Sequence, residues 1–182
     1  YFSEYGLMKY RVVVEVRWLQ ALIANKEIPE LVAVSAESAA LLDSIASTFS
    51  LADAARVKEI EATTNHDVKA IEYLIKEKLE GHAEFQQALE FVHFACTSED
   101  INNLAYALTI KQATEQVWLP KAKEVQQKLA GLAHANADLG MLSRPHGQPA
   151  TPTTLGKELA VFAHRLKRQI SRVENQEYLG KF

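Results

Sequence analysis

The sequence predicts an all-α protein, and three observations lead to that prediction. Helix formers such as Ala, Leu, Glu, Lys and Gln are plentiful among the 182 residues, whereas Gly and Pro number only 7 and 5. Apolar residues recur at steps of three or four over long stretches. Residues that commonly cap helices stand in front of several of these stretches. We therefore expect several helices joined by short polar segments.

The first helix is expected to begin after Ser3 and to run to about Ala24. Four valines between residues 12 and 16 favour a strand by propensity, but the periodic apolar pattern around them extends over about 20 residues and favours a helix. Pro29 then marks a break.

Three further helices follow in the amino-terminal half. Ser35 is a candidate cap for the second helix, and Ser50 with Asp53 resembles a capping box at the start of the third. The fourth helix is expected to stop at Gly81. The apolar residues between 85 and 92 suggest one more short helix.

The carboxyl-terminal half carries longer helical patterns. One runs from Ile101 to Leu132, and Pro120 should kink or break it. Residues 136–152 form the clearest loop, after which Thr153 or Thr154 caps a last helix. Because short helices give way to long ones near Thr97, we place a domain boundary there, with residues 1–96 in one domain and 97–182 in the next.

Composition argues against several classes of function. The chain has 20 basic and 23 acidic residues and a net charge of −3, which gives no electrostatic reason to expect nucleic acid or an anionic membrane as a partner. No apolar run approaches the roughly 20 residues that span a bilayer. The single cysteine, Cys96, cannot form an internal disulfide and is typical of a reducing, cytoplasmic setting. We expect it to pack in the interior rather than to act as a nucleophile.

Three polar segments interrupt the helical pattern, at residues 63–67, 97–100 and 143–154, and each precedes a helix. A helix start presents free N–H groups and a partial positive charge, so it can hold a carboxylate or a phosphate. Three such starts would suit a substrate with several anionic groups. The alternative is that all three are ordinary caps, which are far commoner than ligand sites.

Candidate functional residues lie in these segments. His146, between a proline and a glycine, is of the residue type that exchanges protons near neutral pH, although a lone loop histidine is usually only solvated. In the first segment Asp67 could orient His66 or, more simply, cap the helix, while Asn65 offers an amide.

In the second segment Thr97 and Ser98 offer hydroxyl groups, and Ser98 could equally be an N-cap. The six histidines form no HExxH pair, and the chain has no GxGxxG or GxxxxGK loop, so we expect neither a metal site nor a phosphate-binding loop.

The three segments read TTNHDVKAIEY, HFACTSEDINN and SRPHGQPATPTT, and in this order they resemble the bacterial branch of the adenylosuccinate lyases. The opening FSEYGLMKYRVVVEVRWLQ is similar to that branch as well, and the likeness covers all 182 residues. HGQPAT is typical of these enzymes among the fumarase and aspartase relatives. The resemblance implies an all-α fold with a central bundle of long helices, and a homotetramer whose active sites take segments from three subunits.

The resemblance also implies a function. The family releases fumarate from adenylosuccinate, giving AMP, and from the succinylated imidazole carboxamide intermediate of purine synthesis, without a metal or organic cofactor. By motif, His146 is expected to be the general acid. Asn65, His66 and Asp67 are expected to contact the substrate, as are Thr97 and Ser98.

Two features separate this chain from the family pattern. Pro145 stands where the family usually has threonine, which removes a hydroxyl and a backbone donor beside His146. The family's base is a serine on a later loop that these 182 residues do not include, and the chain begins with Tyr1 and ends at Phe182. We therefore expect an amino-terminal piece of a longer protein that is inactive by itself.

Two other interpretations stay open at this point. A sister lyase, such as an argininosuccinate- or carboxymuconate-type enzyme, would share the elimination chemistry but not the nucleotide. A non-catalytic helical module would only mediate self-association.

Overall fold

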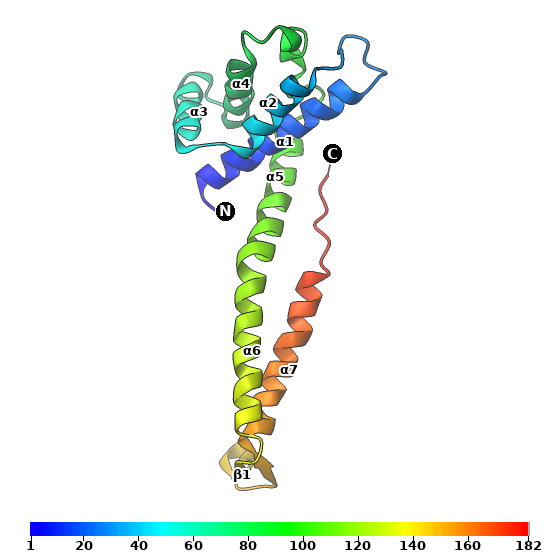
Figure 1. Cartoon of the computed structure of the whole chain (residues 1–182). Coiled ribbons are helices and arrows are strands. Elements are labelled where there is room, and N and C mark those ends of the chain that lie inside the picture. Colours follow the sequence, from blue (N-terminus) through cyan, green and yellow to red (C-terminus); the bar gives the residue numbers. More distant parts are fainter. Residues whose placement is uncertain (182) are drawn as a thin grey trace. The chain divides into compact units, whose positions relative to one another are not determined.

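The structure, a computed structural model, describes residues 1–181 and is built almost entirely of helices, which confirms the predicted all-α class (Figure 1). Contacts divide the chain into two units, residues 1–110 with 178–181 and residues 111–177, and each is described by itself. The helices that begin in unit 1 are α1 (Glu4–Ala24), α2 (Ala36–Ser47), α3 (Leu51–Thr64), α4 (Asp67–Leu79), η1 (Ala83–Phe85), η2 (Leu89–Phe91) and α5 (Ser98–Ala113). The elements of unit 2 are η3 (Thr114–Trp118), α6 (Leu119–Ala135), β1 (Gly140–Leu142), η4 (Pro145–Gly147), β2 (Pro152–Thr154) and α7 (Leu155–Glu174).

The predicted helix starts in unit 1 are confirmed by their hydrogen bonds. The Ser3 hydroxyl accepts from the Gly6 amide at 3.2 Å, and Ser35 caps α2 in the same way. Ser50 and Asp53 form the complete capping box at the start of α3. Each cap satisfies N–H groups that the helix itself leaves unpaired.

The valine-rich stretch of α1 is helical because it is buried. Val12 and Val16 are fully buried and pack in the main core of unit 1 with residues of α2, α3 and α4. Full burial of such a side chain contributes about 1.5–3 kcal/mol, whereas the helix propensity of valine costs at most about 0.7 kcal/mol. Burial therefore decides the conformation, as the periodicity predicts.

A second apolar cluster joins α1 to the beginnings of α4 and α5. Its buried members are Tyr10 and Val14 from α1, Val68 from α4, and Ile101 and Ala105 from α5. Val68 and Ile101 lie within the first turns of their helices. This cluster fixes two of the three predicted polar segments against the same face of α1.

In unit 2, α6 and α7 lie side by side and are joined by a hairpin (Figure 1). Thr154 caps α7 by accepting from the Lys157 amide at 3.1 Å, which decides between the two predicted caps. At Gly156, a Cβ atom would lie 2.4 Å from the carbonyl oxygen of Ala133, so only glycine allows this approach of the two helices.

Two expectations for unit 2 are wrong in detail. Within the predicted loop 136–152, β1 pairs with β2, with Met141 opposite Thr153. Pro120, which was expected to kink or break the run from Ile101 to Leu132, does not end it. It lies in the first turn of α6, directly after the π-helical turn η3, where its missing N–H is tolerated.

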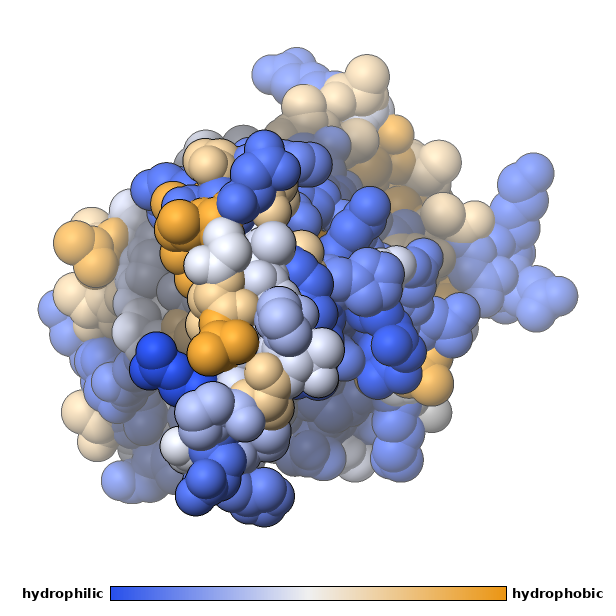
Figure 2. Space-filling view, turned by 90° about the horizontal axis from the view of Figure 1, so that it is seen from below, coloured by the Kyte–Doolittle hydropathy of each residue, from blue (hydrophilic) through white to orange (hydrophobic). Residues whose placement is uncertain are grey.

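Large hydrophobic side chains are exposed at several places in unit 2. Figure 2 looks at the hairpin end, where hydrophobic residues stand among hydrophilic ones, and Leu139, Met141 and Leu142 are exposed there. Within residues 1–181, every helix is too short or too polar to span a lipid bilayer.

Two further predictions concern a short helix between residues 85 and 92 and a domain boundary at Thr97. The short helix expected between residues 85 and 92 is divided into η1 and η2. The proposed domain boundary at Thr97 lies directly before α5, whereas the contact-based units part within α5. The boundary of the folding domains in the longer protein stays a prediction.

Candidate functional site

The first predicted segment forms the turn between α3 and α4. Asn65 ends α3 in the left-handed conformation, with φ 51°, which asparagine tolerates better than most residues. His66 is the N-cap of α4, and its Nδ1 atom accepts a hydrogen bond of 3.1 Å from the Lys69 amide. The cap predicted for Asp67 is therefore supplied by His66, because the imidazole nitrogen reaches the third amide of the helix.

The second predicted segment starts α5. The backbone N–H and the hydroxyl of Thr97 both donate to Oδ2 of Asp100, at 2.7 and 2.8 Å. These two hydrogen bonds, that from the backbone N–H first, lower the pKa of Asp100. Ser98 is the first residue of α5, so the alternative of an N-cap at Ser98 is wrong: Asp100 closes the turn from Thr97.

The two segments meet at their histidine and serine. The Nε2 atom of His66 lies 3.4 Å from Oγ of Ser98. Because Nδ1 accepts from a backbone N–H, the proton of the neutral ring resides on Nε2 and points to the serine oxygen. The Ser98 hydroxyl then keeps its own proton for donation to a ligand.

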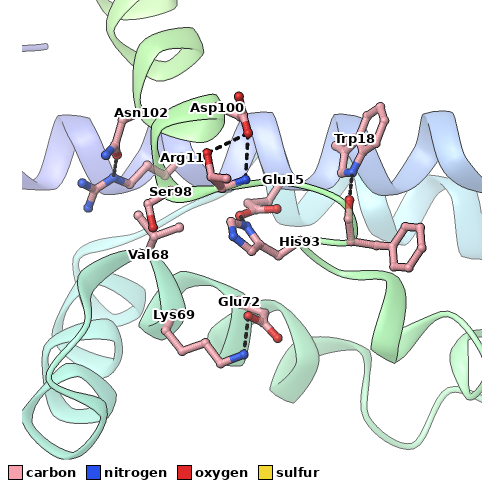
Figure 3. Close-up of polar contacts among 12 residues, drawn as sticks. Arg11, Glu15, Trp18, Val68, Lys69, Glu72, His93, Ser98, Asp100 and Asn102 are labelled. Carbon is pink, nitrogen blue, oxygen red and sulfur yellow. Dashed lines mark hydrogen bonds and ion pairs between the residues drawn. The ribbon is translucent and has the colours of Figure 1, made fainter. Parts of the chain in front are cut away.

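A buried arginine lies behind these segments. Arg11 of α1 donates from Nη2 to Oδ2 of Asp67 at 2.6 Å and from Nε to Oδ1 of Asn102 at 2.9 Å. Figure 3 shows Arg11 next to Asn102, with Ser98 and Val68 close by. Partial burial opposes ionisation of Asp67, but the Arg11 charge and the Val68 N–H outweigh it and lower the pKa of Asp67.

The third predicted segment belongs to unit 2 and surrounds His146. The backbone N–H of Ser143 donates to Thr151 O at 3.0 Å, and that of Ala150 donates to Ser143 O at 2.9 Å, which closes the loop. At its tip, His146 adopts a left-handed conformation with φ 54° and is exposed. The hydrogen-bonded base of this loop leaves the imidazole at an exposed tip.

The sequence matches the lyase family over residues 1–179. The chain belongs to this family. The predicted resemblance to adenylosuccinate lyases is confirmed as well: the chain is 53% identical to the adenylosuccinate lyase of Vibrio cholerae and 52% identical to that of Haemophilus influenzae. Each alignment covers 99% of this chain and 40% of the relative, so the chain spans about two fifths of the length of these relatives.

Solved structures show the same fold at lower identity. The fumarate lyase of Mesorhizobium sp. BNC1 has a TM-score of 0.72 at 22% identity, and it aligns with 95% of this chain and 38% of its own. The β-carboxy-cis,cis-muconate cycloisomerase of Acinetobacter calcoaceticus has a TM-score of 0.71 at 21% identity, with the same coverage. These likenesses show that the chain shares its fold with the corresponding parts of these two enzymes.

A second polar pair, formed by Glu15 and His93, was not predicted from the sequence. Glu15 of α1 is fully buried, and its Oε1 lies 2.6 Å from Nδ1 of His93, while Oε2 has no hydrogen-bond partner (Figure 3). Burial raises the pKa of Glu15, and the hydrogen bond to the Glu15 carboxylate raises the pKa of His93. A charged residue within the apolar pattern of α1 was the available signal, both here and at Arg11.

The segment after His93 leads directly to Thr97. His93 and Ala95 both have positive φ, at 66° and 60°, and the Trp18 indole N–H donates to Phe94 O at 2.8 Å. Cys96 is half-buried against the second apolar cluster, in keeping with the expected packing role, and burial raises the pKa of its thiol to about 12. A thiol that stays protonated at neutral pH is a poor nucleophile.

Unit 1 therefore assembles an imidazole, a serine hydroxyl and two helix starts. Such groups can donate hydrogen bonds to an anionic ligand and do not themselves require a metal. Within residues 1–181, no three His, Cys, Asp or Glu side chains are grouped so that they could hold a metal ion.

Proposed function

We propose that this protein catalyses β-elimination of fumarate from adenylosuccinate, and from the succinylated imidazole carboxamide ribotide of purine synthesis. The observation that carries the proposal is identity of 52–53% to adenylosuccinate lyases over 99% of the chain. The fold alone would not distinguish this activity from that of other lyases, since one fold hosts many chemistries.

The geometry at α4 and α5 fits the anionic part of such a substrate. Removal of a proton beside a carboxylate builds negative charge on that carboxylate, and fixed donors that face this charge lower the barrier. We assign this task to Ser98, whose oxygen faces the His66 Nε2 atom at 3.4 Å, and to the amides at the start of α5. Asn65 and Thr97 border the same two helix starts.

The hydrogen bonds that Asp67 already accepts limit how it can contact a substrate. One carboxylate oxygen accepts from Arg11 and the other from the Val68 amide, although about half of the side chain is exposed. A substrate would then meet a neutralised carboxylate rather than a free negative charge.

We assign the general acid to His146. The nitrogen that leaves the succinyl carbon is a poor leaving group as an anion and must be protonated while the C–N bond breaks. A positioned acid contributes about 10²- to 10⁴-fold to such a step. The base that removes the carbon-bound proton is expected outside these 182 residues, so the chain alone is expected to be inactive.

Assembly is part of the proposal. Several large apolar side chains of unit 2 are exposed: Val117, Trp118, Val125, Leu132 and Phe162. Such side chains on long helices are normally covered by other helices. We expect the longer protein to form a homotetramer in the cytoplasm, with each active site shared between subunits.

The direct test is an assay of the full-length protein with adenylosuccinate and, separately, with argininosuccinate. Fumarate release is followed by ultraviolet absorbance, and product AMP by chromatography. Release from adenylosuccinate only is expected. Release from argininosuccinate, or no turnover of either compound by a folded oligomer, would reject the proposed function.

A further inference from the structure

Arg11 links the two segments of the candidate site in unit 1 from behind. Its guanidinium donates to Asp67, the residue after His66, and to Asn102, one helical turn after Ser98. The Asp67 and Asn102 partners are 35 residues apart in sequence, on α4 and α5. A single side chain thus bonds both helices whose starts form the site.

The contact that depends on this spacing is a weak one. At 3.4 Å, the His66 Nε2 to Ser98 Oγ distance is at the long end for a hydrogen bond, so the pair cannot fix its own geometry. The apolar contacts of Val68 and Ile101 resist separation of the helices but give little control over sliding. Two hydrogen bonds from one planar group supply that control.

The arginine itself is shielded from a ligand. Its side chain is only 7% exposed, and Tyr10 and Val14, its neighbours on α1, are buried in the second apolar cluster. The planar guanidinium holds Nε and Nη2 at a fixed spacing, so that each donates to a different helix, whereas the lysine ammonium is a single compact group on a flexible stem.

We propose that Arg11 is a positioning residue, which sets the distance between His66 and Ser98 by holding Asp67 and Asn102 together. The importance of this distance for catalysis rests on the proposed function, whereas the link between the two helix starts does not. A positional error of about 1 Å in a site can cost about 10²-fold in rate.

The test compares two exchanges on the same helix of the full-length protein. Arg11→Lys keeps the charge but loses the planar group whose Nε and Nη2 atoms donate to the two helices. Arg17→Lys is the matched control, because Arg17 pairs on the surface with Asp43. Arg11→Met, which keeps much of the volume, guards against an effect peculiar to lysine.

Two measurements are made well below the unfolding temperature of each variant. Hydrogen exchange should become roughly fivefold faster in peptides covering residues 66–70 and 98–103 together in both Arg11 variants, and stay unchanged in Arg17→Lys. Under the same conditions kcat/KM for adenylosuccinate should fall about 10- to 100-fold in the Arg11 variants only.

The outcomes test separately the link between the two helix starts and its effect on catalysis. Unchanged exchange in either segment overturns the link, whatever the activity. Faster exchange in both segments with kcat/KM within threefold of the wild type overturns the role in positioning for catalysis. If the wild type itself does not act on adenylosuccinate, the proposed function fails, and the exchange data still decide whether Arg11 joins the two segments.

Discussion

The imidazole Nε2 of His66 lies 3.4 Å from the hydroxyl oxygen of Ser98, although the two residues are 32 positions apart in the sequence. Each stands at the start of a helix, so the partially positive ends of two helices are brought to the same place. His66 has two tasks there, since Nδ1 caps α4 while Nε2 faces Ser98.

The two tasks of His66 can be separated by His66→Asn. Asparagine is among the best N-caps, so the variant should keep stability within about 0.5 kcal/mol of the wild type. Its short amide cannot reach Ser98, and kcat/KM for adenylosuccinate should fall at least about tenfold. Thermal unfolding and steady-state kinetics of the full-length protein measure the two effects.

His66→Ala provides the comparison. It should lose the cap as well, at a cost of about 1 kcal/mol, in addition to the catalytic loss. Unchanged affinity and turnover in both variants would contradict a substrate-binding role for His66.

At Asn65, the conformational role of the backbone can be tested separately from a substrate contact by the side-chain amide. Its φ of 51° suits glycine, so Asn65→Gly should change stability by less than about 1 kcal/mol while removing the amide. If the amide contacts the substrate, KM should rise about 5- to 20-fold, the equivalent of one hydrogen bond. An unchanged KM would assign Asn65 a conformational role only.

The buried pair of Glu15 and His93 makes a prediction about stability. His93→Ala leaves a fully buried carboxylate without its partner and should cost about 3–5 kcal/mol. In the double variant Glu15→Leu/His93→Ala, no polar group is orphaned, so it should be more stable than the single variant. Urea unfolding compares the two, and a less stable double variant would contradict this account.

The same pair predicts a pH dependence. Both groups have a raised pKa in the folded protein, relative to 4.5 for glutamate and 6.5 for histidine, so the folded state binds protons more tightly. The resulting stabilisation is complete below the unfolded values and is lost as the pH rises through the folded ones. As the pH rises above 6.5, the unfolding temperature should therefore fall more steeply in the wild type than in the double variant. Equal slopes would show that the pair holds no extra proton.

Much of unit 1 can be predicted from the sequence because local signals and burial agree there. The helix of residues 4–24 follows from apolar periodicity despite its valines, and Ser3 and Ser50 are local caps that need no tertiary information. The site segments could be located in the same way, since each interrupts a periodic pattern.

The roles within those segments depend on partners far away in the chain. Asp67 reads as a cap, yet its carboxylate faces Arg11, 56 residues earlier, and His66 takes the cap. The pairing of Glu15 with His93 spans 78 residues and leaves no local pattern. From the sequence, Pro120 is expected to break a helix. The π-helical turn that precedes it, and that lets the helical run continue, could not be predicted from the sequence pattern.

His146 carries the most demanding prediction. The residue has a left-handed backbone, so a replacement must tolerate positive φ, and His146→Asn does so better than the otherwise closer match His146→Gln. Neither amide can donate a proton at neutral pH. Both variants of the full-length protein should therefore bind adenylosuccinate while kcat falls about 10²- to 10⁴-fold. Single-turnover fumarate release with a separate binding measurement distinguishes the chemical step from affinity, and a loss of less than about tenfold in both variants would reject His146 as the acid.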